Sequence, residues 1–293
     1  MDRIKSRTYT YWLAIPGLLL FSVFFLVPAF FGVLLSLTNT IGIDFSKFSF
    51  AGLSNYALIF EEPELRVAVF NTFLFAFITT VCKVGFALFL AVILNMKIRG
   101  RNALRTIFFL PAVLNSVAVG LIFISMMHPQ TGFINRTLRL LGLGFLAKDW
   151  LADPHLAIFS VASIEIWRWT GFCMVILLTG LQSIPQDVYE AGDIDGASPW
   201  QRFRYITFPL VLPAFNNAFI LSLVGGLKVF DLVQCTTQGG PGYATQVFGT
   251  LVFSSFSQGR FGEGCAESIA LSIVVAIFAI PSYLGIQKKE VET

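Results

Sequence analysis

The chain has 293 residues, of which 56% are hydrophobic and only 13% are charged. A water-soluble domain carries about 25% charged residues, so this composition excludes a soluble globular protein and indicates a lipid bilayer. The net charge of +3 is small and spread along the chain. It does not form the clustered basic face that nucleic-acid binding requires.

Six long apolar runs predict an all-α membrane protein with six transmembrane helices in one domain over residues 1–293. Each run approaches or exceeds the roughly 20 residues that cross about 30 Å of hydrocarbon. The first run is too long for a secretory signal and lacks a small-residue cleavage site, so we expect it to be retained. The predicted spans cover about residues 11–37, 69–94, 107–126, 156–181, 210–233 and 267–286.

The placement of lysine and arginine predicts the orientation of these spans. With a cytoplasmic N-terminus, the inner segments carry more basic residues than the outer segments although they are shorter. This excess places both termini, and the segment between the fourth and fifth spans, in the cytoplasm. The inner basic residues are Arg3, Lys5, Arg7, Lys97, Arg99, Arg101, Arg105, Arg202, Arg204, Lys288 and Lys289, and the outer ones are Lys47, Arg66, Arg136, Arg139, Lys148 and Arg260.

The polar interval between the fourth and fifth spans predicts two short helices joined by a glycine turn. Two serines stand three residues before a glutamine, as in a capping box, and a proline holds the first position of the second helix. A loop that only joins two spans can be a few residues long, so we expect a docking surface; the alternative is an amphipathic loop on the membrane surface. The residues that mark the helix ends and the turn are Ser183, Gln186, Gly192, Gly196, Ser198, Pro199, Gln201, Pro209 and Pro213.

Ionisable groups within the membrane are costly and indicate function. Glu165 and Arg168 are three residues apart, as are Lys228 and Asp231, so each pair can lie on one helix face, while Lys83 stands alone in the second span. The two pairs either share a water-filled cavity or form private salt bridges, and both interpretations stay open. Trp167 and Trp169 flank Arg168, and because they point in different directions, at most one of them faces a ligand.

Several kinds of site are not indicated. The cysteines, Cys82, Cys173, Cys235 and Cys265, are far apart, so they are expected to be small buried hydrophobes, and the two histidines have no ligand-spaced partner for a metal. The motifs of phosphate-binding loops, nucleophile elbows and zinc proteases do not occur in the sequence. A nucleotide site and a membrane-embedded enzyme are therefore not expected.

Residues 190–209, which read E-A-G-D-I-D-G-A-S-P-W-Q-R-F-R-Y-I-T-F-P, resemble the EAA loop of permease subunits in binding-protein-dependent ABC importers. The similarity is greatest to the sugar-type branch of the maltose and glycerol-3-phosphate permeases. Gly192 replaces the second alanine of the EAA pattern. F-x-G-L-x-N-Y at residues 50–56 and a segment after the fifth span also fit. The matching positions of the loop and of that last segment are Glu190, Ala191, Asp195, Gly196, Ala197, Pro209, Phe230, Asp231, Gly239, Gly240, Pro241 and Thr245.

The resemblance covers roughly residues 12–290 and implies the type I transmembrane fold of ABC importers. It implies a heterodimer with a second, homologous permease subunit, two ATPase subunits, an extracytoplasmic solute-binding protein and a sugar substrate. It also implies a multi-pass protein of the bacterial inner membrane. The C-terminus lacks the A-V-K-G type of ending, so the chain resembles the first permease subunit. No cofactor is expected on this chain, because ATP and magnesium would bind to the ATPase subunits.

The implied mechanism is alternating access, driven through a coupling loop at residues 183–209. Alternatives are an ABC permease for glycerol-3-phosphate or another polar solute, and a stand-alone secondary transporter driven through the buried charges. The residues expected to couple to the ATPase are Tyr189, Glu190, Ala191, Asp195, Gly196, Ala197, Trp200 and Phe203. The expected substrate pathway is Glu165, Trp167, Arg168, Trp169, Lys228 and Asp231, and the expected outer mouth is Gly239, Gly240, Pro241 and Thr245.

Overall fold

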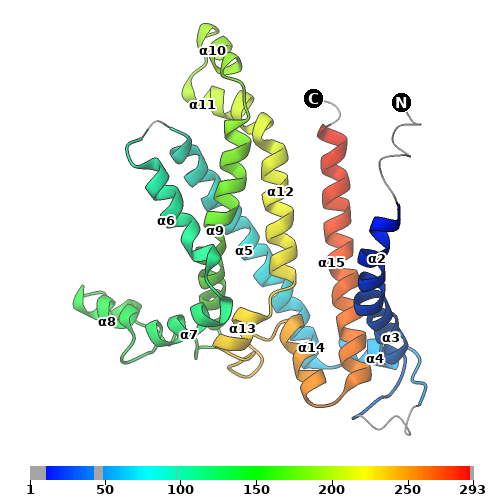
Figure 1. The fold of residues 1–293 in the computed structure, drawn as a ribbon. Coiled ribbons are helices and arrows are strands. Elements are labelled where there is room, and N and C mark those ends of the chain that lie inside the picture. Colours follow the sequence, from blue (N-terminus) through cyan, green and yellow to red (C-terminus); the bar gives the residue numbers. More distant parts are fainter. Residues whose placement is uncertain (1–10, 43–48, 97, 291–293) are drawn as a thin grey trace. The chain divides into compact units, whose positions relative to one another are not determined.

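The computed structural model describes residues 11–42, 49–96 and 98–290, and these residues are almost entirely helical (Figure 1). Within the described ranges, extended pairing is limited to isolated bridges between Thr38 and Phe50 and between Ile41 and Arg260. The predicted all-α fold class is confirmed. Of the basic residues used to predict orientation, Arg3, Lys5, Arg7, Lys47 and Lys97 lie outside the described residues.

The chain forms two units, one of residues 1–62 and 251–271 and the other of residues 63–250 and 272–293. In the first unit, residues 15–36 make one 22-residue apolar helical stretch. Asn55 caps its exit, because its side-chain amide donates to the carbonyls of Ser36 and Thr38 at 2.8 and 2.9 Å. The elements are η1 (Tyr11–Ala14), α2 (Ile15–Phe21), η2 (Ser22–Leu26), α3 (Val27–Ser36), α4 (Ser54–Glu61), most of α14 (Phe248–Ser257) and the start of α15 (Phe261–Glu290).

In the second unit, three long helices, α5, α9 and α12, lie side by side, and α6 packs against α9 (Figure 1). The helices α10 and α11 lie at one end of this bundle, and α7, α8 and α13 lie at the other. The elements are α5 (Pro63–Asn95), α6 (Arg101–Val113), α7 (Ser116–Met126), α8 (Phe133–Leu140), η4 (Gly144–Leu146), α9 (Ala157–Gln182), α10 (Gln186–Ile194), α11 (Pro199–Arg202), η5 (Phe203–Thr207), α12 (Phe208–Leu227) and α13 (Asp231–Thr236).

Five described helices are long and apolar enough to cross a membrane, and α6 with α7 makes a sixth if this pair is one broken span. The pair is bent by 97°, so the predicted continuous helix over residues 107–126 is wrong. Leu114 is extended, and the Asn115 side chain accepts hydrogen bonds from the backbone N–H groups of Val117 and Ala118 at 2.9 and 3.3 Å. A new helix therefore begins at an N-cap inside the apolar run.

The fifth span also differs from its prediction. Its helix runs from Pro199 to Leu227, so Pro209 and Pro213 lie within it and do not end the preceding unit. Pro209 follows the π-helical turn η5 by two residues, just as Pro28 follows the π-helical turn η2. A π turn already interrupts the regular hydrogen-bond ladder, so the helix continues past a residue that lacks an N–H.

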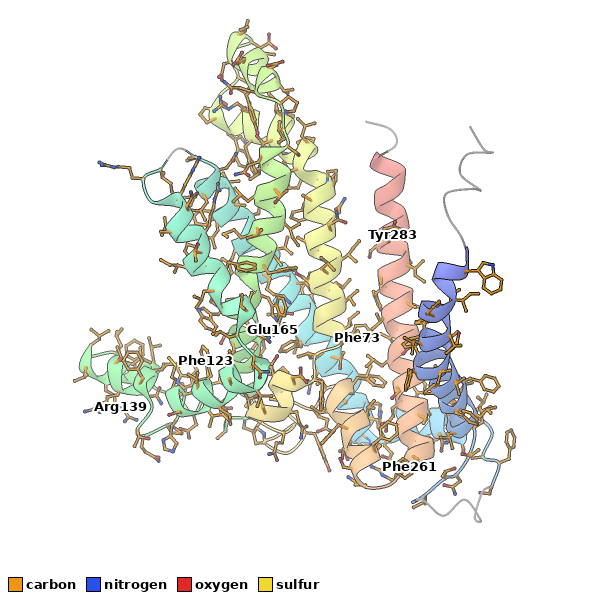
Figure 2. All side chains as sticks on the ribbon, viewed as in Figure 1. Phe73, Phe123, Arg139, Glu165, Phe261 and Tyr283 are labelled. Carbon is orange, nitrogen blue, oxygen red and sulfur yellow. The ribbon has the colours of Figure 1, made fainter. Side chains whose placement is uncertain are left out.

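Glycines allow the long helices of the second unit to approach closely. A Cβ atom at Gly226 of α12 would lie 2.7 Å from the Cα atom of Ala76 on α5, and one at Gly171 of α9 would lie 1.8 Å from the carbonyl oxygen of Phe108 on α6. Small residues at such contacts are typical of membrane helix packing, where close van der Waals contact replaces the hydrophobic effect. Figure 2 shows that the buried core residue Glu165 lies within this bundle.

Candidate functional site

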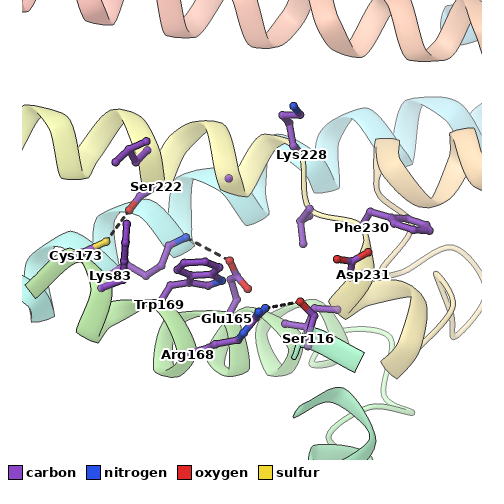
Figure 3. A pocket seen from close by; sticks show the side chains of 15 residues that line it. Lys83, Ser116, Glu165, Arg168, Trp169, Cys173, Ser222, Lys228, Phe230 and Asp231 are labelled. Carbon is purple, nitrogen blue, oxygen red and sulfur yellow. Dashed lines mark hydrogen bonds and ion pairs between the residues drawn. The ribbon is translucent and has the colours of Figure 1, made fainter. Parts of the chain in front are cut away.

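A cavity of about 380 Å³ opens between α5, α7, α9, α12 and α13 in the second unit (Figure 3). Charged residues from four separate segments line it, together with aromatic and small polar side chains. All the predicted pathway residues except Trp167 are in this lining. The polar and aromatic lining residues are Lys83, Ser116, Glu165, Arg168, Trp169, Phe172, Cys173, Ser222, Lys228, Phe230 and Asp231.

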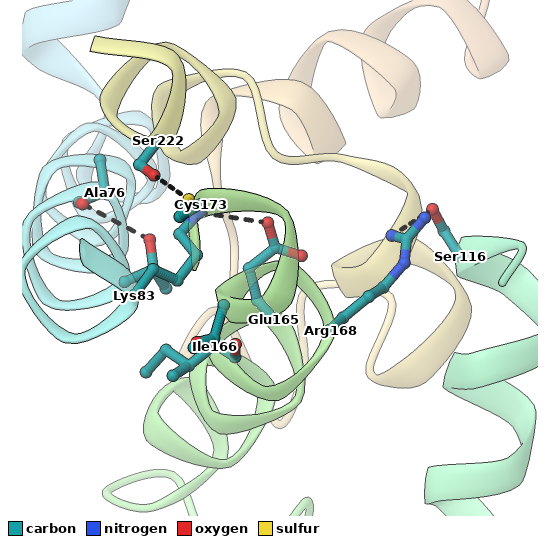
Figure 4. A network of polar contacts seen from close by, with 10 residues as sticks. Ala76, Lys83, Ser116, Glu165, Ile166, Arg168, Cys173 and Ser222 are labelled. Carbon is teal, nitrogen blue, oxygen red and sulfur yellow. Dashed lines mark hydrogen bonds and ion pairs between the residues drawn. The ribbon is translucent and has the colours of Figure 1, made fainter. Parts of the chain in front are cut away.

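Lys83 is the ion-pair partner of Glu165, with 3.5 Å between Nζ and Oε1 (Figure 4). The two side chains are 3% and 8% exposed, so the pair is buried between α5 and α9. Lys83 is therefore not a solitary charge, and the alternative of a private salt bridge between Glu165 and Arg168 is wrong. The spacing of three residues within one helix suggested Arg168 as the partner of Glu165. The signal for the observed pair was a lysine without a neighbour in its own span, together with a carboxylate in another span.

Arg168 instead joins α9 to the break between α6 and α7. One guanidinium nitrogen donates to Ser116 Oγ at 2.7 Å and another to the carbonyl oxygen of Leu114 at 3.0 Å. The guanidinium carbon lies 5.0 Å from the ring centroid of Trp169, within the range of a cation–π contact. The kink that the sequence did not predict thus supplies both acceptors for a buried arginine.

The two tryptophans that flank Arg168 have different surroundings. Trp169 lines the cavity. Trp167 is absent from the lining, and its ring packs on Phe123 of α7 with the centroids 5.3 Å apart. The two indoles therefore point in different directions, and whether Trp169 faces a ligand stays a prediction.

Lys228 and Asp231 both line the cavity and are exposed, but no ion pair joins these two described residues. Lys228 caps the end of α12 and Asp231 begins α13, so the backbone between them is not helical. The spacing of three residues therefore does not place them as it would on a continuous helix. The cavity presents these two separate charges beside a buried ion pair and an indole face, a set that can bind a polar, hydroxyl-rich solute.

The segment after α9 folds as two short helices around a glycine turn. The second N-cap is confirmed: Ser198 Oγ accepts from the N–H of Gln201 at 3.3 Å, and Gln201 Oε1 accepts from the N–H of Ser198 at 2.8 Å. The first is wrong, since Ser183 caps the end of α9 and Pro185 precedes α10 without a side-chain bond. The second short helix, α11, continues into the fifth span, so it is not a separate element.

Gly196 makes the turn with φ = 70°, a left-handed conformation that glycine adopts readily. The N–H of Gly196 donates to Asp193 O and that of Ala197 to Gly192 O, which is a Schellman ending of α10. Gly192 lies inside α10 and not at the turn, so its predicted role is wrong. A Cβ atom there would lie 2.6 Å from Ile206 Cδ1, so this glycine lets α10 pack on the start of the fifth span.

The predicted coupling residues divide into an inward and an outward set. Tyr189 and Phe203 line a cavity of about 650 Å³ with the ends of α5 and α9, and Arg202 binds Asp193 at 2.6 Å. Glu190, Ala191, Asp195, Gly196 and Trp200 are exposed, and Ala197 is half-buried. Three large side chains on this end, Ile194, Trp200 and Tyr205, are exposed, as side chains that meet a partner are.

The loop between α13 and α14 is held by the start of α5. The Asn71 side-chain amide contacts the carbonyl oxygens of Tyr243, Ala244 and Gln246 at 3.3, 3.1 and 3.0 Å. Thr245 is buried and bonds to Thr237 and to the carbonyl oxygen of Gly240, each at 2.7 Å. Of the predicted outer-mouth residues, Gly239 and Thr245 therefore lie inside the loop, Gly240 and Pro241 are half-buried, and its exposed tip is Gly242 and Tyr243.

The cysteines and histidines form no cluster that suggests a metal. Among the described residues, no three His, Cys, Asp or Glu side chains come together as a metal site requires. All four cysteines are free. Outside the spans, burial raises the pKa of the Cys235 thiol, so this thiol is protonated at neutral pH.

Known transport proteins are similar to this chain over most of its length. Residues 83–287 match the family model described as the binding-protein-dependent transport system inner membrane component. The trehalose/maltose transport system permease protein MalF of Thermococcus litoralis is 34% identical over 278 residues, which cover 95% of this chain and 93% of that protein. The multiple sugar-binding transport system permease protein MsmF of Streptococcus mutans is 32% identical over 279 residues, covering 95% of each chain.

A solved structure also shares the fold. The crystal structure of a bacterial alginate ABC transporter, in complex with an alginate pentasaccharide-bound periplasmic protein, contains a chain that matches with a TM-score of 0.81 at 23% identity. The match covers 96% of this chain and 94% of that one.

Proposed function

The chain belongs to the family of inner membrane components of binding-protein-dependent transport systems, and we propose that it forms half of the translocation pathway of an ATP-driven importer of a carbohydrate. The other half is a second, homologous permease subunit. ATP and magnesium bind to two separate ATPase subunits, and this chain itself catalyses no reaction.

The cavity between α5, α9 and α12 supports the choice of a carbohydrate. Its charges are the buried pair Lys83–Glu165 together with Arg168, Lys228 and Asp231, and Trp169 offers an indole face beside them. A sugar ring presents hydroxyls to such charges and an apolar face to an indole. Relatives named for trehalose and maltose and for multiple sugars match this chain over most of its length.

The helix-turn-helix at residues 186–202 is the element that we assign to coupling. Its helix α10 ends at the glycine turn of Gly196, and α11 begins at the capping box of Ser198 and Gln201. Trp200 is exposed, and α11 continues through η5 into the fifth span. A movement of this helix-turn-helix is therefore transmitted along α12 to the cavity. We propose that it faces the cytoplasm together with both termini, and that the opposite end, with the loop of Gly239–Thr245, receives the solute-binding protein.

Two glycines allow a matched test of coupling. Gly196 and Gly100 both have left-handed backbones, with φ of 70° and 80°, and a Cβ atom at either meets nothing within 4 Å. Gly196→Asp and Gly100→Asp therefore impose a similar backbone cost of about 1–2 kcal/mol. We expect both proteins to insert and to assemble with the ATPase subunits, but only Gly196→Asp to hydrolyse ATP without sugar uptake. Normal uptake by Gly196→Asp, or equal loss in both variants, contradicts the assignment.

Reconstitution tests the class of transporter and its substrate. Uptake of a labelled oligosaccharide into proteoliposomes should require both permease subunits, the ATPase subunits and the solute-binding protein. Trp169→Ala should lower uptake, whereas Trp167→Ala, outside the cavity lining, should retain it. Transport by the purified chain without an ATPase would contradict the proposal and favour an ion-driven transporter.

A further inference from the structure

The connector between α7 and α9 carries an amphipathic element that the transport mechanism does not use. It comprises α8 and the turn η4, and its outward side chains are large and apolar. Leu140 is 81% exposed and Phe145 is 72% exposed, which is far more than a surface in water favours. We define the α8 apolar face as Phe133, Leu140, Leu141, Phe145 and Leu146, all of which are exposed.

This face is held in place by the other side of the same element. The side-chain amide of Asn135, which is 1% exposed, donates to the carbonyl oxygens of Pro129 and Lys148 at 3.0 and 2.8 Å, and its oxygen accepts from Trp150 Nε1 at 2.7 Å. Ile134 and Trp150 also pack against the buried core of the second unit. The apolar face is therefore presented by a fixed scaffold and does not result from a loose loop.

The position of α8 indicates what this face meets. Figure 1 shows α8 at the end of the bundle opposite to α10, where it extends outward to the side of α7. The preceding helix α7 also carries exposed apolar side chains, Val117, Leu121 and Ile122. An amphipathic helix that extends sideways from the end of a transmembrane bundle is placed to lie in the plane of the lipid headgroups.

The charge of α8 and η4 indicates which kind of surface the apolar face meets. Residues 133–146, from the start of α8 to the end of η4, contain Arg136 and Arg139 and no aspartate or glutamate, and Lys148, Asp149 and Asp153 follow in the connector. Arg139, which is labelled in Figure 2, donates hydrogen bonds to the carbonyl oxygens of Pro129 and Gln130. Arg136 is exposed beside the apolar face. Cations next to a Phe- and Leu-rich face match the interfacial helices that bind anionic lipid.

We propose that α8 and η4 form a membrane-surface anchor, with the α8 apolar face inserted at the acyl boundary and Arg136 binding anionic phospholipid headgroups. The anchor holds the bent pair of α6 and α7, and with it the acceptors of Arg168, at a fixed depth. It rests on the membrane location of the chain and is independent of which solute is transported.

Fluorescence quenching in nanodiscs tests this anchor on the full chain, purified with the subunits that accompany it. The four native cysteines are replaced by serine or alanine, and Leu140→Cys is labelled with a nitrobenzoxadiazole fluorophore. Asp149→Cys, an exposed polar site in the same connector, is the matched control. We expect brominated phospholipid to quench the label at position 140 and not at 149, and iodide to do the reverse.

The other outcomes overturn the proposal. Iodide quenching at 140 equal to that at 149 would place the face in water, and protection from both quenchers would place it against a protein partner. If Leu140→Cys does not assemble, Phe145→Cys serves instead. With brominated phosphatidylglycerol and phosphatidylcholine compared, Arg136→Gln should reduce the preference for the anionic lipid about fivefold. Equal quenching by both lipids in the unmodified connector would overturn the anionic assignment.

Discussion

The buried ion pair of Lys83 and Glu165 is the contact whose removal gives the clearest prediction. Lys83→Met removes the ammonium charge while keeping a long side chain, and Glu165→Gln removes the carboxylate charge while keeping its shape. Each single variant leaves one uncompensated charge at a site where the side chains are 3% and 8% exposed. The double variant leaves neither charge.

The distance between the two charges sets the size of the expected loss of stability. Two unit charges separated by the observed 3.5 Å attract by about 5 kcal/mol at an effective dielectric constant of about 20. Desolvation of both groups offsets much of this attraction, but removal of one partner alone costs about 3–5 kcal/mol because the other charge stays buried. We therefore expect each single variant to lose about that much stability, and the double variant to lose less than either.

Equilibrium unfolding in mixed micelles with a rising fraction of sodium dodecyl sulfate, followed by circular dichroism, gives the four free energies of this double-mutant cycle. The coupling energy is the difference between the double variant and the sum of the singles. Losses that add to within about 0.5 kcal/mol would show that the charges do not interact and would refute the reasoning. Sugar uptake by the double variant then separates the two interpretations of the pair, since a purely structural pair permits normal uptake and a pathway pair does not.

Two further predictions concern helix packing and the loop after α13. Gly226→Ala should lose about 1–3 kcal/mol of stability because its Cβ atom would meet α5. Gly225→Ala, where a Cβ atom meets nothing within 4 Å, should keep the stability or raise it by up to about 1 kcal/mol. Equal effects of the two variants in the same unfolding assay would contradict the close contact. Asn71→Asp keeps the size of the side chain but removes the donor to Tyr243, Ala244 and Gln246, so we expect faster proteolysis at Tyr243, and a loop as resistant as the wild type would show that this amide does not hold it.

The residue pattern of 190–209 was sufficient to predict the family, and the glycine turn and the capped second helix within it were predicted because they are local features. Gly196 and the Ser198–Gln201 box depend on backbone geometry within a few residues, and both lie where the pattern predicts them. The same locality explains the failures nearby. Ser183 and Gly192 have the expected residue types, but α9 extends to Gln182, and Ile206 packs on Gly192. Neither fact can be predicted from the few residues around these two positions.

Composition and the length of the apolar runs also determined, without any structure, that the chain crosses a membrane as helices, since hydrocarbon forces every backbone group to bond within its own helix. Only the tertiary structure decided which charges meet. Lys83 and Glu165 are 82 residues apart in the printed sequence and come together because α5 packs on α9, and Arg168 finds Ser116 and Leu114 because α6 and α7 bend apart at Asn115. Helical spacing predicts neighbours on one helix, whereas the partner of a buried charge is set by which helices pack together.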